Sequence, residues 1–113
     1  MAAASLTVTA RTEISAIHKL SQRLNAARGL AHSDVLLALV REHAAEITEL
    51  FSKNNSHYVV ETGDLLILCL EILIEAGEDA DEILATCYGR YHKKLNRLLA
   101  EQTGPASREG ENA

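Results

Sequence analysis

A single proline, Pro105, occurs in this chain of 113 residues, and it lies close to the C-terminus. Proline interrupts the interior of a helix because it lacks a backbone N–H, so no such break precedes residue 105. Apolar residues upstream recur at helical spacing, as in the stripe Ile14, Ile17, Leu20 and Leu24. Strand-like alternation is nearly absent. The sequence therefore predicts an all-α protein.

Four amphipathic segments are predicted, at residues 12–28, 33–53, 57–76 and 79–102. A glycine follows the first and the third segment, as is typical of helix ends. Ser33 and Asp34 are alternative N-caps for the second segment. Asp79 and Glu82 form a D-x-x-E pattern that resembles a capping box at the start of the fourth.

Short connections between consecutive helices favour antiparallel neighbours. The third segment is apolar around most of its circumference, which indicates a helix in the middle of a bundle. We therefore expect an antiparallel four-helix bundle-like domain over residues 12–102, between a flexible N-terminus (1–11) and a disordered tail (103–113). A domain this small buries a modest core, so we expect it to be completed by oligomerisation as a homodimer or homotetramer.

Charge and hydropathy exclude several classes of function. The net charge of −5 argues against binding of a nucleic acid polymer, although a metal ion could still recruit an anionic substrate. The longest apolar run, residues 65–74, is too short to span a membrane and contains Glu71. Cys69 and Cys87 form no metal-binding or redox pattern. With no signal-like segment at the N-terminus, we expect a cytoplasmic protein.

Acidic residues flank the apolar faces of the second and third segments. Glu42, Glu46 and Glu49 gather on one flank of the second, and Glu61 and Asp64 lie three residues apart on the third, directly before an aliphatic run. Carboxylates beside so apolar a surface are costly unless paired or metal-bound. An antiparallel hairpin brings the two sets towards each other, and such oxygens suit Mg²⁺.

These residues carry a resemblance to a known family. Glu46-Ile47-Thr48-Glu49, followed after eleven residues by Glu61-Thr62-Gly63-Asp64, resembles the E-x-x-E … E-x-x-D signature of the MazG-like all-α nucleoside triphosphate pyrophosphohydrolases. That superfamily includes the dimeric dUTPases and dCTP pyrophosphatases. Gly77-Glu78-Asp79 and the basic stretch from Lys93 to Arg97 are also similar, so the resemblance covers residues 12–101.

The resemblance implies hydrolysis of a normal or damaged nucleoside triphosphate to the monophosphate and pyrophosphate. It implies Mg²⁺, with Mn²⁺ as an alternative, held by Glu46, Glu49, Glu61 and Asp64, and a catalytic role in activating water for Glu46 or Glu49. Candidates for binding the substrate phosphates are Lys93, Asn96 and Arg97, followed by Arg90 and Lys94, and Tyr91 is a candidate for stacking on the base.

One half of the signature departs from the family. Members commonly carry E-E-x-x-E, whereas this chain reads Glu42-His43-Ala44-Ala45-Glu46. Alignment on Glu46 places His43 at a ligand position, and alignment on Glu42 places Ala45 there; a third reading pairs Glu46 with Glu49. His43 also lies on the apolar stripe, which fits a structural histidine. As a ligand it would tilt the site from Mg²⁺ towards Mn²⁺.

Two other classes of protein compete with the enzyme. A helical dimer with the same fold but without catalysis, acting as a regulatory or nucleotide-binding module, fits the altered His43. A ferritin-like di-iron protein needs Glu-x-x-His pairs, and no glutamate here has a histidine three residues later. Among the other histidines, we expect His18 and His32 on the surface, and His57 and His92 receive no role.

Overall fold

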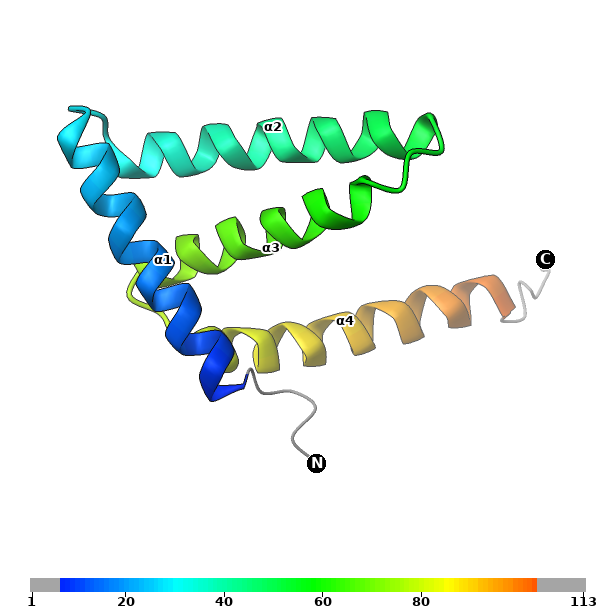
Figure 1. The fold of residues 1–113 in the computed structure, drawn as a ribbon. Coiled ribbons are helices and arrows are strands. Elements are labelled where there is room, and N and C mark those ends of the chain that lie inside the picture. The colour runs from blue at the N-terminus through cyan, green and yellow to red at the C-terminus, as the bar shows by residue number, and fades with distance from the viewer. Residues whose placement is uncertain (1–6, 104–113) are drawn as a thin grey trace. The chain divides into compact units, whose positions relative to one another are not determined.

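The computed structural model describes residues 7–103, which form four helices and no strand (Figure 1). The helices are α1 (Val8–Ala27), α2 (His32–Ser52), α3 (Tyr58–Glu75) and α4 (Ala80–Thr103). They belong to two compact units, one holding α1 to α3 and the other holding α4 from Asp81 onwards. Each unit is described by itself. The all-α prediction is confirmed, and within the described residues no helix is long and apolar enough to cross a membrane.

The first helix begins four residues earlier than predicted. Thr7 is its N-cap, and the Thr7 hydroxyl accepts a hydrogen bond from the backbone N–H of Ala10 at 3.0 Å. Such a cap satisfies one of the free N–H groups at a helix start. Residues 8–11, predicted to be flexible, are therefore helical. Thr103, predicted to belong to the tail, is the last residue of α4; residues 1–6 and 104–113 lie outside the described part of the chain.

The helix ends follow the sequence signals in part. Gly29 and Gly77 adopt φ of +70° and +76°, the left-handed conformation that commonly ends a helix. The N-cap of α2 is Ala31, which has no side-chain cap, so neither Ser33 nor Asp34 has the predicted capping role. Asp34 instead lies in the first turn, where a negative charge is favoured by the helix dipole.

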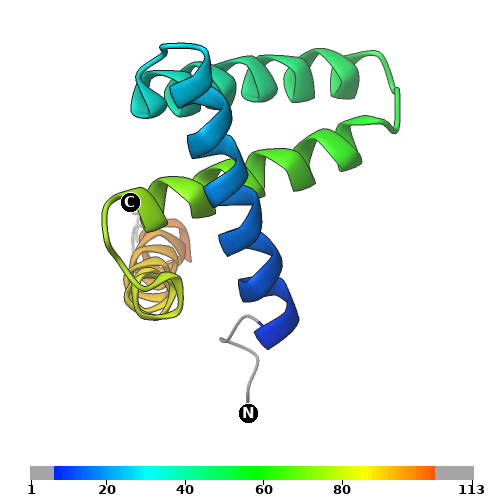
Figure 2. The same cartoon turned by 60° about the vertical axis from the view of Figure 1, so that its left-hand side comes forward.

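Helices α2 and α3 form an antiparallel hairpin, and α1 crosses both of them (Figure 2). The connection spans residues 53–57 and includes Asn54 with a φ of 56°. Beside the turn, the rings of Phe51 and Tyr58 meet edge to face with centroids 5.0 Å apart. The hairpin fixes which residues of α2 lie opposite which residues of α3.

The core of this unit is small and partly polar. Its buried apolar residues are Ile14, Leu36, Leu68 and Leu70. Three polar residues, His18, Asn25 and Glu71, are equally buried. Helix α3 contributes three of these buried residues. One side of α3 is nevertheless exposed, so the helix matches only in part the prediction that it lies in the middle of a bundle. A four-helix bundle and an oligomer stay predictions.

Candidate metal centre on the α2–α3 hairpin

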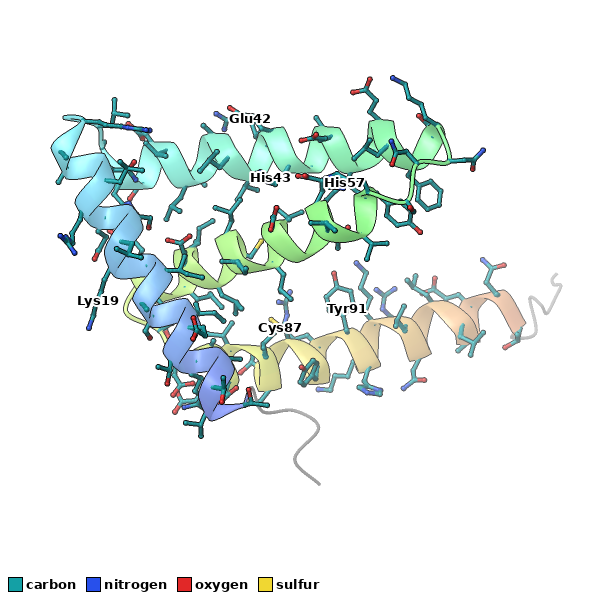
Figure 3. All side chains as sticks on the ribbon, in the orientation of Figure 1. Lys19, Glu42, His43, His57, Cys87 and Tyr91 are labelled. Atoms are coloured by element: carbon teal, nitrogen blue, oxygen red, sulfur yellow. The ribbon has the colours of Figure 1, made fainter. Side chains whose placement is uncertain are left out.

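Three potential metal ligands meet between α2 and α3. One ligand atom each of His43, Glu61 and Asp64 lies within 4.8 Å of the other two. His43 comes from the middle of α2 and projects towards α3 (Figure 3). Glu61 and Asp64 are three residues apart on the first turns of α3, so one helix face presents both carboxylates.

The ring orientation of His43 is set by its own helix. His43 Nδ1 lies 2.9 Å from the carbonyl oxygen of Leu39. A carbonyl only accepts, so Nδ1 carries the proton and donates it. The other nitrogen, Nε2, lies 3.5 Å from Glu61 Oε1. Histidines that bind metals are commonly held in this way, with one nitrogen donating to a carbonyl and the other free for the ion.

Glu61 lies between two histidines. Its Oε1 faces His43, and its Oε2 lies 3.3 Å from Nε2 of His57, one turn earlier on the chain. The Glu61 side chain is 13% exposed, whereas that of His57 is 56% exposed. The sequence analysis gave His57 no role. The i, i+4 spacing of His57 and Glu61 is the signal that could have indicated this pair.

Asp64 is the open member of the cluster. Its side chain is exposed, and within residues 7–103 no hydrogen bond or ion pair engages it. Its neighbour Gly63 also faces open space, since a Cβ built on Gly63 would meet nothing within 4 Å. Asp64 and the helix surface at Gly63 are therefore both exposed.

The predicted carboxylates of α2 do not join this cluster. Glu42, Glu46 and Glu49 are all exposed, and none belongs to the group of ligand atoms around Glu61. Each residue turns a helix by about 100°, so Glu46 points roughly 60° away from the side that carries His43. Among the alternatives left by the sequence, the structure therefore brings His43 to Glu61 and Asp64.

Glu49 has a different partner. Its Oε2 accepts a hydrogen bond from Lys53 Nζ at 2.9 Å. This hydrogen bond, together with the positive charge of Lys53, lowers the pKa of the Glu49 carboxyl from its ordinary value. A carboxylate with a lowered pKa is a weaker base, which makes Glu49 less suited to activate water.

The chemistry of the donor set fits a divalent cation. Two carboxylates and one imidazole can bind Mg²⁺, Mn²⁺ or a later transition metal. Mg²⁺ prefers oxygen, so the nitrogen of His43 moves the preference towards Mn²⁺. Binding of Mg²⁺ thus stays a prediction, and Mn²⁺ is the ion that these three donors match better.

The predicted substrate-binding residues are all exposed on α4. They are Arg90, Tyr91, Lys93, Lys94, Asn96 and Arg97. Lys94 Nζ lies 5.8 Å from the centroid of the Tyr91 ring, a cation–π distance, and Tyr91 projects from the middle of the helix (Figure 3). Arg97 forms an ion pair with Glu101 at 3.0 Å. Within α4 itself these side chains make a cationic surface.

Two histidines were placed wrongly by the sequence analysis. His18 was expected on the surface but is 5% exposed, and the side chain of His32 is 13% exposed. His18 is four residues after the buried Ile14 and so shares its helix face, which is a signal of burial. Both belong to a second group of potential metal ligands, completed by Glu71.

No family model, no curated protein and no solved structure matches this chain.

Proposed function

We propose that this protein is a divalent-metal-dependent nucleoside triphosphate pyrophosphohydrolase centred on His43, Glu61 and Asp64. The observation that supports it is the convergence of these three side chains from two helices within 4.8 Å. The Glu61-Thr62-Gly63-Asp64 motif, which resembles that of the MazG-like enzymes, supplies two of the three. The substrate class comes from this resemblance.

Each residue has a distinct part in the proposed site. A bound divalent cation would supply positive charge for the phosphate oxygens of the substrate. His43 is oriented by the Leu39 carbonyl, and Glu61 is paired with His57 at 3.3 Å, so both are positioned before any ligand arrives. Asp64, which is exposed, completes the donor set. Such preorganisation lowers the cost of binding.

Glu46 is the proposed residue that orients the attacking water. Its carboxylate is exposed, and no ion pair engages it within the described residues. The hydrogen bond to Lys53 makes Glu49 the poorer candidate. Replacement of Glu46 by Gln should lower kcat while metal affinity stays within about twofold, since a residue that acts in the chemical step affects kcat.

The cationic surface of α4 is proposed to bind the outer phosphates, on the ground of its charge. Lys93→Gln and Arg97→Gln should raise KM with little change in kcat, the pattern expected when uniform substrate binding is lost. Lys19→Gln, on α1, is the matched control and should leave KM unchanged.

Pyrophosphate release tests the proposal directly. The full chain is incubated with a panel of normal and damaged nucleoside triphosphates and with Mg²⁺ or Mn²⁺, and wild type is compared with Asp64→Asn. Loss of a site residue should reduce turnover by about 10- to 100-fold or more. Asp34→Asn, which removes an exposed carboxylate in the first turn of α2, should retain full turnover.

Two results would overturn the assignment. Unchanged turnover in Asp64→Asn would place the reaction elsewhere. No turnover of any triphosphate by the wild type, combined with nucleotide binding seen by calorimetry, would instead support the non-catalytic regulatory or nucleotide-binding module.

We also propose that the protein forms a homodimer or homotetramer. Several large apolar side chains of the α2–α3 hairpin are strongly exposed, and extended apolar surface of this kind marks association sites. They include Leu37, Phe51, Val59, Val60 and Leu66. Light scattering on the wild type and on Leu66→Lys measures the mass of the particle in solution. The wild type should have at least twice the mass of one chain. A monomeric wild type would rule out the proposed oligomer.

A further inference from the structure

A second group of histidines and carboxylates lies where α1, the start of α2 and the end of α3 meet. One ligand atom each of His18, His32 and Glu71 lies within 4.8 Å of the other two. Glu75, one turn beyond Glu71, reaches the same place. Each of the three helices thus contributes at least one donor, and all four residues belong to the unit formed by α1 to α3.

The distances within this group resemble those around a tetrahedral metal ion. Glu75 Oε1 lies 3.2 Å from His18 Nε2 and 3.7 Å from His32 Nε2. Ligand atoms at the usual bond length from a tetrahedral zinc are about 3.4 Å from one another. Each of the two imidazole nitrogens therefore already lies from the Glu75 oxygen at nearly the spacing that an ion would impose.

Burial leaves this group in need of positive charge. Glu71 is 3% exposed, and its partners in the described structure are His18, whose Nδ1 lies 3.1 Å from Glu71 Oε1, and the Ser21 hydroxyl. A buried carboxylate is strongly destabilising unless its charge is compensated. A second observation points to a ligand: Nε2 of His32 is buried and has no hydrogen-bond partner in the described structure.

Neighbouring groups hold the two rings in place for metal binding. If His18 Nδ1 donates to Glu71, the lone pair of His18 Nε2 is directed towards Glu75. The amide nitrogen of Asn25 lies 2.8 Å from His32 Nδ1 and can only donate, so in this arrangement Nδ1 accepts and the proton of a neutral His32 ring is on Nε2. Rotation of the Asn25 amide by 180° presents its oxygen to an Nδ1–H and leaves the lone pair of Nε2 for a metal. Ser21 donates a further hydrogen bond to Glu71. Partners of this kind orient the ligands in established metal sites.

We propose that His18 and His32, with a carboxylate oxygen of Glu75, bind one divalent transition-metal ion of the zinc class, while Glu71 holds the His18 ring through Nδ1. The ion would link α1, α2 and α3 and would replace the missing charge beside Glu71. Two imidazole nitrogens favour Zn²⁺ over Mg²⁺ or Ca²⁺, which bind through oxygen. This site is separate from His43, Glu61 and Asp64 and does not depend on the proposed hydrolase activity.

The ion has a route to the site. Glu75 is 34% exposed through its side chain and lines a surface hollow of about 300 Å³. The other lining residues are Ser33, Leu36, Leu37, Ile72 and Ala76. The group is therefore open to solvent on the side of Glu75.

Titration of the wild-type full chain with zinc chloride is the first test. The ring nitrogen resonances of each histidine are followed by NMR, because metal binding to a nitrogen moves its own signal. We expect His18 and His32 to respond through Nε2 at about one equivalent of zinc. A response confined to His43 and His57, or none in His18 and His32, would overturn the proposal without any variant.

Calorimetry on variants then assigns the ligands. His32→Ala and Glu75→Gln should each weaken zinc binding at this site at least tenfold, and the thermal stabilisation by zinc should be lost. His92→Ala, a histidine of α4 outside both groups, is the matched control and should bind like wild type. Asp64→Asn separates the two centres, since it should leave the zinc response of His18 and His32 intact. Unchanged zinc affinity in His32→Ala would refute the site.

Discussion

His43 Nε2 lies 3.5 Å from Glu61 Oε1, and this approach joins the middle of α2 to the first turns of α3. Because Nδ1 of the same ring is used by the Leu39 carbonyl, Nε2 is the nitrogen left for a ligand. Among the residues of α2 that the sequence left as alternatives, an imidazole is thus the group that faces Glu61. The metal preference of the proposed site is the property that this imidazole affects most directly.

Replacement of His43 by Glu should change the preferred metal. A carboxylate in place of the imidazole provides an all-oxygen donor set, which suits Mg²⁺ better. We expect the ratio of kcat/KM with Mg²⁺ to kcat/KM with Mn²⁺ to rise about tenfold. His57→Gln, which touches Glu61 but lies outside the cluster, should shift that ratio by less than about twofold. An unaltered ratio in His43→Glu would mean that His43 is not a ligand.

Gly63→Ala should separate stability from activity. Glycine inside a helix costs about 1 kcal/mol relative to alanine, and a Cβ at Gly63 meets nothing within 4 Å. The free energy of unfolding should therefore rise by about 1 kcal/mol. Pyrophosphate release should fall if the substrate approaches this backbone closely. A Cβ at Gly89 on α4 also meets nothing within 4 Å, so Gly89→Ala should give a similar stabilisation and retain activity. Equal activity in the two variants would argue against a substrate that approaches Gly63.

Leu36→Ala should destabilise the α1–α3 unit strongly. Leu36 is 2% exposed, the most buried large side chain described, and truncation of such a residue costs about 2–5 kcal/mol. Leu20, on α1, is 60% exposed, so Leu20→Ala should cost about 0.5 kcal/mol or less. Urea unfolding followed by circular dichroism compares the two variants. Equal losses would contradict the difference in burial between Leu36 and Leu20.

Lys53→Met should raise the pKa of the Glu49 carboxyl back towards its ordinary value. The hydrogen bond and the charge of Lys53 lower that pKa in the folded protein. The pair therefore contributes stability above the ordinary pKa of glutamate and loses that contribution as the pH falls through the lowered value. Since Glu49 is fully exposed, the NMR titration of its carboxyl carbon is the suitable measurement. Lys19→Met should leave the Glu49 titration unchanged.

Local features were read correctly from the sequence. The four helices, the left-handed glycines at positions 29 and 77, and the shared face of Glu61 and Asp64 depend on residues a few positions apart. Helical periodicity and turn chemistry act over that range, so the sequence carries them directly. The early start of α1 is a local feature that periodicity missed, because the cap at Thr7 precedes the first apolar stripe.

Tertiary structure decided which side chains meet. The sequence left Glu42, His43, Glu46 and Glu49 as alternatives, and the packing of α2 against α3 turned His43 towards Glu61. The burial of His18 beside Glu71 required α1 to cross the hairpin, which joins positions 53 residues apart. Such pairings follow from the summed packing of whole helix faces rather than from any short motif. The sequence by itself thus determined the helices and the Glu61–Asp64 pair, and only the fold selected the histidines that accompany the carboxylates.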